Sequence, residues 1–167
     1  LVSPVGLAFR NGNLLVADTS CNKIVEFGLN DGGEYAYTGF AITTTANAYN
    51  RLTAVNRDLS LCENDYAVLS DSSITLYENG SYRKISLETF QLDYMPLHIA
   101  LGKKYICLAD SYNVTFIDRE TLGVVDPDSD MGSVRPNAVT YSNDCFYILS
   151  GEIVYSCDEE TLTMTRM

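Results

Sequence analysis

Residues 4–9, with the sequence PVGLAF, begin a pattern that recurs three more times along the 167-residue chain. The aligned segments are residues 50–55 (NRLTAV), 96–101 (PLHIAL) and 136–141 (PNAVTY). Their starts are separated by 46, 46 and 40 residues. A period of this length that covers the whole chain predicts a repeat architecture in which each repeat is one supersecondary unit.

Each unit contains further segments that are typical of β-strands. The second segment is almost continuously apolar, and in the four units it is residues 15–18, 68–71, 107–110 and 148–151. The third segment follows a tight turn, and in the four units it is residues 23–27, 73–77, 113–117 and 152–155. A weaker fourth strand is expected at residues 34–40, 82–87, 123–126 and 161–167. Valine, isoleucine, leucine and aromatic residues dominate these runs, and Asn-Gly or similar turns separate them, which favours strands joined by hairpins.

Four strands in every repeat predict an all-β fold, a β-propeller with four blades of about four antiparallel strands each. We expect a single domain over residues 1–167, with blades at approximately 1–46, 47–92, 93–132 and 133–167. The apolar second strands suit inner blade strands that neighbouring blades cover on both faces. Two arrangements remain open, a closed four-bladed ring and part of a larger propeller. A partial propeller predicts an exposed apolar blade face at one or both ends.

The first unit resembles the NHL repeat. The similarity lies in Pro4, in residues 6–8 (GLA), in residues 12–19 (GNLLVADT) and in residues 22–24 (NKI). The second unit lacks the proline and the glycine, and the fourth has Gly151 where the repeat has an aspartate. The resemblance implies a β-propeller, and proteins with such repeats usually carry more than four blades.

The charge of the chain disfavours several classes of partner. Eleven lysine and arginine residues against 22 aspartate and glutamate residues give a net charge of −11, which opposes binding to nucleic acid or to an anionic membrane surface. No segment has the roughly 20 apolar residues of a membrane-spanning helix, and residues 1–9 lack the features of a signal peptide. Two N-glycosylation sequons, at Asn79 and Asn113, favour an extracellular or cell-surface location slightly over an intracellular one.

Three aspartates recur at the end of the second strands: Asp18, Asp71 and Asp110. They resemble a set of carboxylate ligands, but a short acidic side chain at this position typically accepts backbone N–H groups of the turn that follows. Blade symmetry would also hold them far apart. We therefore interpret them as structural turn residues and predict neither a metal site nor a cofactor.

Polar residues near the start of the innermost strands are the candidates for a ligand site at the mouth of the central channel. They are Arg51, His98 and Asn137. His98 is the only histidine, which excludes a zinc site built from several histidines within this chain. The positions that the alignment brings to the channel mouth include no carboxylate, which weakens a metal-dependent hydrolase.

The five cysteines show no CxxC pairing. Cys145 and Cys157 flank the turn at residues 150–152, and a three-residue turn would place them opposite each other on adjacent strands. A cross-strand disulfide is then geometrically possible, with two ordinary buried thiols as the alternative.

We expect a non-catalytic binding or scaffolding module that contacts a protein, a peptide or a glycan through one loop face. Its 12 tyrosines suit such contacts. The alternative is a hydrolase or lyase of the lactonase kind with its site at the channel mouth. A third possibility is a partial ring that further blades or a second chain complete.

Overall fold

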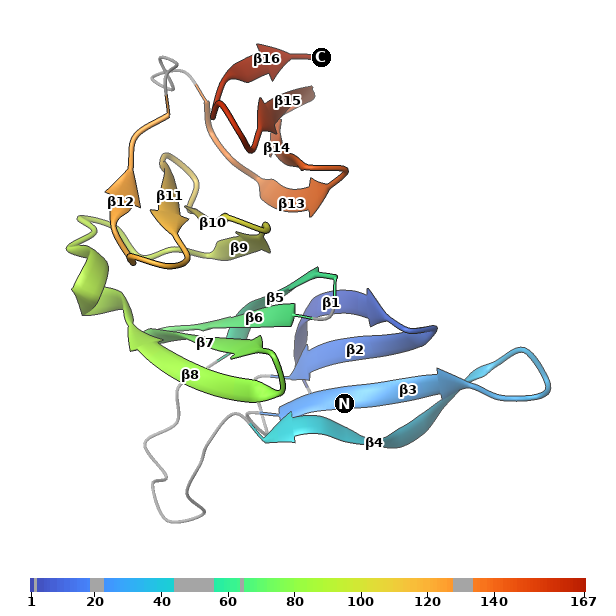
Figure 1. Cartoon of the computed structure of the whole chain (residues 1–167). Helices are drawn as coiled ribbons and strands as arrows, with labels where there is room; N and C mark the ends of the chain where they lie inside the picture. Colours follow the sequence, from blue (N-terminus) through green and yellow to red (C-terminus); the bar gives the residue numbers. More distant parts are fainter. Residues whose placement is uncertain (2, 19–22, 44–55, 64, 128–133) are drawn as a thin grey trace. The chain divides into compact units, whose positions relative to one another are not determined.

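The computed structural model describes residues 1, 3–18, 23–43, 56–63, 65–127 and 134–167. These residues form sixteen strands and one short 3₁₀ helix, η1 (Leu87–Phe90). The strands form four antiparallel sheets of four strands each, and the strand order in each sheet follows the chain (Figure 1). This is the arrangement of four β-propeller blades and confirms the predicted fold class.

The four blades differ mainly in the length of their outer strands. Blade 1 contains β1 (Pro4–Arg10), β2 (Asn13–Asp18), β3 (Lys23–Leu29) and β4 (Tyr35–Thr43), and blade 2 contains β5 (Asn56–Cys62), β6 (Asp65–Ser70), β7 (Ser73–Glu78) and β8 (Ser81–Ser86). Blade 3 contains β9 (His98–Leu101), β10 (Tyr105–Ala109), β11 (Val114–Asp118) and β12 (Val124–Val125), and blade 4 contains β13 (Ala138–Ser142), β14 (Cys145–Ser150), β15 (Ile153–Asp158) and β16 (Met164–Arg166).

The chain divides into two compact units of two blades each. Unit 1 is Leu1–Ile85 and unit 2 is Ser86–Met167. Blades 1 and 2 belong to unit 1, and blades 3 and 4 to unit 2. The expected boundary between the first two blades, at residue 46, lies outside the described residues.

The first strand of blade 2 corrects the sequence alignment. We expected it at residues 50–55, but β5 is Asn56–Cys62. In the β5–β6 hairpin Asp58 pairs with Leu69, and in the β1–β2 hairpin Gly6 pairs with Ala17. Asp58 therefore has the position in blade 2 that Gly6 has in blade 1. The true offset from blade 1 to blade 2 is therefore longer than 46 residues. The NRLTAV segment misled the alignment because it matches the apolar pattern of residues 4–9, whereas β5 itself (NRDLSLC) alternates polar and apolar residues.

Side chains alternate across each sheet, so every blade has two faces. We define the leading face of blade 1 as the side that carries Leu7 and Val16. The trailing face is the opposite side, which carries Ala8 and Leu15. The same names apply to the equivalent sides of the other blades. In unit 1, the trailing face of blade 1 packs against the leading face of blade 2; the buried core residues are Leu15, Ala17, Ile24, Leu59, Tyr66 and Val68.

The same packing rule applies in unit 2. Ala100, Cys107 and Phe116 on the trailing face of blade 3 pack against Phe146 and Cys157 on the leading face of blade 4. The Phe116 and Phe146 rings meet edge to face with 5.2 Å between their centroids, a preferred geometry for aromatic pairs. Leading against trailing is therefore the rule by which blades pack in both units.

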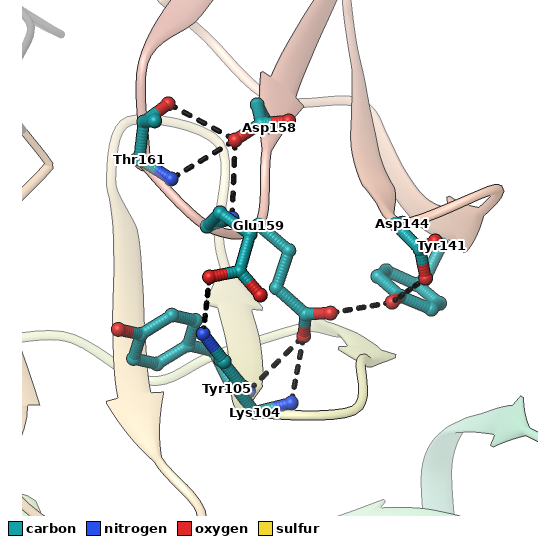
Figure 2. Close-up of polar contacts among 8 residues, drawn as sticks. Lys104, Tyr105, Tyr141, Asp144, Asp158, Glu159 and Thr161 are labelled. Carbon is teal, nitrogen blue, oxygen red and sulfur yellow. Dashed lines mark hydrogen bonds and ion pairs between the residues drawn. The ribbon is translucent and has the colours of Figure 1, made fainter.

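A turn that joins the third and fourth strands repeats in unit 2. Residues 118–122 (DRETL) and 158–162 (DEETL) share a motif. In the first copy, Asp118 Oδ1 accepts hydrogen bonds from the backbone N–H of Thr121 at 2.7 Å and from its hydroxyl at 2.8 Å. Asp158 accepts the same pair of bonds from Thr161 (Figure 2). This aspartate and threonine pair, which the sequence analysis missed, fixes the length of the turn.

Candidate functional site

Two of the three residues expected at the channel mouth lie in the described part of the chain. His98 begins β9 and pairs with Ala109. Asn137 precedes β13, and its backbone N–H donates to Leu149 O at 2.8 Å. Arg51 lies outside the described residues. In the register of the hairpins, the residue of blade 2 that is equivalent to His98 is Asp58. The expectation that these positions contain no carboxylate is therefore wrong, and the misplaced β5 is the reason.

Asn137 lines a polar pocket in unit 2. The pocket has a volume of about 430 Å³, and its lining comes from the turn after β10, the segment before β13 and the turn after β14; the lining residues are Ser111, Tyr112, Arg135, Asn137, Ser150 and Gly151. His98 is not among them. These loops all lie at the end of blades 3 and 4 where the first strand begins. The pocket is thus on a loop face, where binding residues of rigid scaffolds concentrate.

Hydrogen bonds inside the pocket determine which polar atoms remain for a ligand. Asn137 Oδ1 accepts the backbone N–H of Gly151 at 2.7 Å. Because a backbone N–H can only donate, the amide oxygen must face it, and the Nδ2 group is left as a donor. Ser150 Oγ accepts the backbone N–H of Arg135 at 2.9 Å, which leaves its hydroxyl proton free to donate. The Asn137 amide nitrogen and the Ser150 hydroxyl can therefore both donate to a ligand.

The positive charge of the pocket comes from Arg135. Its guanidinium carbon lies 5.3 Å from the centroid of the Tyr112 ring, a distance typical of a cation–π contact. Among the described residues, no carboxylate forms an ion pair with Arg135. The ring contact orients the guanidinium, which carries a positive charge in a chain whose net charge is −11.

The turn beside the pocket is built around Asp110. Its Oδ1 accepts the backbone N–H groups of Tyr112 at 2.8 Å and Asn113 at 2.7 Å. The Asn113 side-chain amide donates to the same oxygen at 3.1 Å. This is an Asx turn, and it holds the backbone that carries Tyr112 at the edge of the pocket.

The other two aspartates of the predicted set have different surroundings. Asp18 is buried, and its two carboxylate oxygens lie 3.4 Å from the backbone nitrogen of Ser3, while the turn after Asp18 lies outside the described residues. In blade 2 the hydroxyl of Ser70 bridges the turn by accepting the N–H of Ser73 at 3.1 Å. Within the described ranges, no three His, Cys, Asp or Glu side chains converge as metal ligands.

A buried carboxylate, that of Glu159, joins blades 3 and 4 at the opposite end of their strands (Figure 2). Glu159 Oε1 accepts the backbone N–H groups of Lys104 at 2.8 Å and Tyr105 at 3.3 Å, and Oε2 accepts the Tyr141 hydroxyl at 2.5 Å. Gly102 is required here, because a Cβ at this position would lie 2.2 Å from Glu159 Oε1. Since donors occupy both oxygens, we interpret Glu159 as a clamp between blades rather than a reactive group.

The β9–β10 hairpin, whose backbone N–H groups donate to Glu159, also accepts hydrogen bonds through its backbone carbonyl groups. Arg119 Nη1 donates to Gly102 O at 2.6 Å and to Lys103 O at 3.2 Å. Lys103 and Asp144 form an exposed ion pair at 2.7 Å, which lowers the pKa of the Asp144 carboxyl through its hydrogen bond and its charge. The sequence analysis did not find this clamp, because its members are distant in sequence and no motif connects them.

The register of blade 4 does not support a Cys145–Cys157 disulfide. Cys145 pairs with Asp158, and Cys157 pairs with Phe146. The two thiols therefore point to opposite faces of the sheet, and both are free. The turn contains two residues, Gly151 and Glu152, instead of the expected three, and the positive φ of 59° at Gly151 is the conformation that a two-residue hairpin turn needs.

Both sequons lie on exposed turns. Asn79 is in the Asn-Gly turn between β7 and β8, and its φ is 50°. Asn113 is exposed, and its Nδ2 atom, the atom that would carry a glycan, donates to Asp110. Glycosylation at either residue stays a prediction. No helix in the part of the chain that the structure describes is long and apolar enough to cross a membrane.

No protein-family model and no curated protein matches the sequence. Solved structures nevertheless match it well in fold. The WD40 domain of Pan2 from Neurospora crassa matches with a TM-score of 0.62 at 13% identity over 99% of this chain, and apo AztD from Citrobacter koseri with 0.55 at 12% over 98%. The extracellular domain of the putative one-component system BT4673 from B. thetaiotaomicron matches with 0.59 at 16% over 96%.

In all three matches this chain spans only part of the other protein. It covers 50% of the Pan2 WD40 domain, 46% of AztD and 21% of the BT4673 domain. At such low identity the comparisons establish the fold alone. The chain is built from β-propeller blades, and it resembles about half of a larger propeller.

Proposed function

We propose that this chain is a non-catalytic propeller module that binds a carboxylate-bearing peptide segment of a partner protein in the loop-face pocket. The observation that carries the proposal is the donor-rich lining: the Arg135 guanidinium, the Asn137 amide nitrogen and the hydroxyls of Ser111 and Ser150. A site made of donors selects a ligand made of acceptors. A carboxylate is the common protein group that accepts several hydrogen bonds and matches the fork of an arginine.

Pre-organisation supports the proposal further. The Tyr112 ring orients the Arg135 guanidinium through the cation–π contact, and the Asp110 carboxylate fixes the backbone of Tyr112 through a hydrogen bond. A ligand therefore does not have to order a free arginine side chain, a cost of about 0.5–1.5 kcal/mol for each side chain that binding immobilises. The exposed ring of Tyr112 also offers apolar surface beside the charged group.

The test uses two capped tripeptides that differ only in charge, acetyl-Ala-Glu-Ala-amide and acetyl-Ala-Gln-Ala-amide. Each is titrated into the isotopically labelled chain, and the amide signals of Tyr112 and Gly151 are followed by NMR. We expect the glutamate peptide to shift both signals and to bind at least about tenfold more tightly than the glutamine peptide, which corresponds to about 1.4 kcal/mol.

Two variants make the test specific. Arg135→Gln should abolish the preference for the glutamate peptide, whereas Arg166→Gln, which removes the same charge from an exposed residue of β16 outside the pocket, should retain it. Equal binding of both peptides, or an unchanged preference in the Arg135 variant, would overturn the proposal. Binding of a neutral oligosaccharide in preference to the peptides would point to a glycan partner instead.

The alternative, a hydrolase or lyase of the lactonase kind, stays a hypothesis. It requires convergent metal ligands, and the described residues contain no group of three that could hold a metal ion. The assignment of the repeats to the NHL kind and an extracellular location likewise stay proposals. The first rests on the similarity of residues 4–24, and the second on the exposed sequons at Asn79 and Asn113.

A further inference from the structure

The leading face of blade 1 is apolar and exposed to solvent. Leu7 is 65% exposed and Phe9 57% exposed, and the strands β3 and β4 extend the face with Leu29, Tyr35 and Tyr37. A cavity of about 490 Å³ lies on this face, between Leu7, Leu14, Val16, Phe27 and Tyr35. Contiguous apolar surface of this kind on a folded domain is typical of an interaction site.

Blade 2 shows what normally covers a leading face. Leu59 pairs with Val68 as Leu7 pairs with Val16, so these positions are equivalent. In blade 2 they are buried, with Leu59 4% and Val68 2% exposed, because they pack against the trailing face of blade 1. The leading face of blade 1 thus has the residues of a blade-to-blade interface, yet Leu7 and Phe9 on it are exposed.

The trailing face that would fit is recognisable by its chemistry. In blades 1 and 3 the first strand contributes a small residue, Ala8 or Ala100, and the second contributes Leu15 or Cys107. Blade 4 presents its own trailing face through Thr140 and Tyr147, together with the paired residues Leu149 and Val154. Leu149 is 38% exposed and Val154 36% exposed. Blade 4 therefore offers a partly exposed trailing face with apolar residues.

We propose that the leading face of blade 1 docks onto the trailing face of blade 4 of a second copy of this chain. Blade 1 contributes the leading face and blade 4 the trailing face of each copy. Two reciprocal contacts of this kind close a dimer, whereas contacts that do not close would extend into an open filament. Two copies bring eight blades together, and the solved propellers that match this chain in fold, AztD and the Pan2 WD40 domain, are about twice its length. The interface continues the packing rule already seen inside both units.

The first experiment measures the mass of the full chain in solution by light scattering. The proposal expects a dimer of about twice the 18.5 kDa chain mass. A monomer over the micromolar range would overturn it and would indicate that the face is covered in another way.

Variants then identify the two faces. Leu7→Glu and Val154→Glu should each give a folded monomer, because both side chains are exposed and neither supports the core of its unit. Tyr82→Gln, a change at an exposed aromatic residue of β8 outside both faces, should leave the dimer intact. Circular dichroism verifies the fold of each variant. A Val154→Glu protein that still dimerises would overturn the pairing of leading with trailing face.

A charge-pair experiment distinguishes the loss of the proposed contact from damage to the fold. Leu7→Lys and Val154→Glu proteins, each monomeric alone, should form a mixed dimer when combined, because the new charges meet at one of the two contacts. Failure of the mixture, with both proteins folded, would contradict the proposed contact. Arg135→Gln should leave the dimer unchanged, so this inference and the proposed peptide site can fail separately.

Discussion

Glu159 stabilises the junction between blades 3 and 4, although burial of a carboxylate is by itself unfavourable. The cost is offset because two backbone N–H groups and one hydroxyl donate to it. Glu160, the next residue, is exposed and pairs with the exposed Lys104. The two neighbouring glutamates therefore have different energetic roles, and only their surroundings distinguish them.

Replacement of Glu159 by alanine should lower the free energy of unfolding by about 3 kcal/mol, because the Lys104 and Tyr105 amides lose their acceptor. Urea denaturation measures the loss. The matched variant Glu160→Ala removes the same charge and should cost less than about 1 kcal/mol, as expected for an exposed ion pair. Similar losses in both variants would contradict the clamp.

Asp118 should make the stability of unit 2 depend on pH. Hydrogen bonds from the Thr121 backbone and hydroxyl lower the pKa of its carboxyl. A lowered folded pKa contributes stability above the unfolded value of about 3.9, and this contribution is lost as the pH falls through the folded pKa. The Asp118→Asn variant should therefore be less stable than the wild type at pH 6, and the difference should shrink by pH 3. A constant difference in thermal unfolding would refute this linkage.

At the scale of secondary-structure elements, the second and third strands of each blade were predictable because a β-branched and apolar run between turn residues has few alternatives. Two elements were not. β5 was placed six residues too early, because NRLTAV matches the repeat pattern better than NRDLSLC does. The turn after β14 was one residue too long in the prediction, and a shift of one residue moves a side chain to the other face of the sheet.

The register of β14 and β15 predicts how the cysteines react. Cys157 is buried, and desolvation raises its pKa to about 12; burial also raises the pKa of Cys107. A thiol-specific reagent should therefore label the partly exposed Cys145 much faster than either of them in the folded chain. Peptide mass analysis after labelling measures the order. A Cys145–Cys157 linkage under oxidising conditions would contradict the register.

The packing of β1 against β5 depends on Gly6. A Cβ at this position would lie 2.7 Å from Leu59 N, closer than packed atoms approach. Gly6→Ala should therefore separate blades 1 and 2 and cost about 1–3 kcal/mol of stability. The exposed Ser81→Ala change in β8 is the control and should stay within about 0.5 kcal/mol. Chemical denaturation measures the free energy of unfolding of both variants. Equal stability of the two variants would contradict a close contact between Gly6 and β5.

For the whole molecule, net charge and apolar surface act in opposite directions. A charge of −11 on each copy repels a second copy, while the leading face of blade 1 attracts one. Added salt screens the repulsion and leaves the apolar contact. The dimer fraction measured by sedimentation should therefore rise between low and moderate salt concentration. A dimer that dissociates on addition of salt would indicate an interface held by charges instead.

The sequence by itself determined the fold class and most strands, because alternating apolar residues and turn residues act locally. It also indicated Asn137 as a candidate ligand-site residue and Asp110 as a candidate turn residue. Only the tertiary structure assembled the pocket around Arg135 and Tyr112, the clamp at Glu159 and the two faces of each blade. Each of these joins segments that are distant in the chain, and a change of one residue in register is enough to move a side chain into or out of contact.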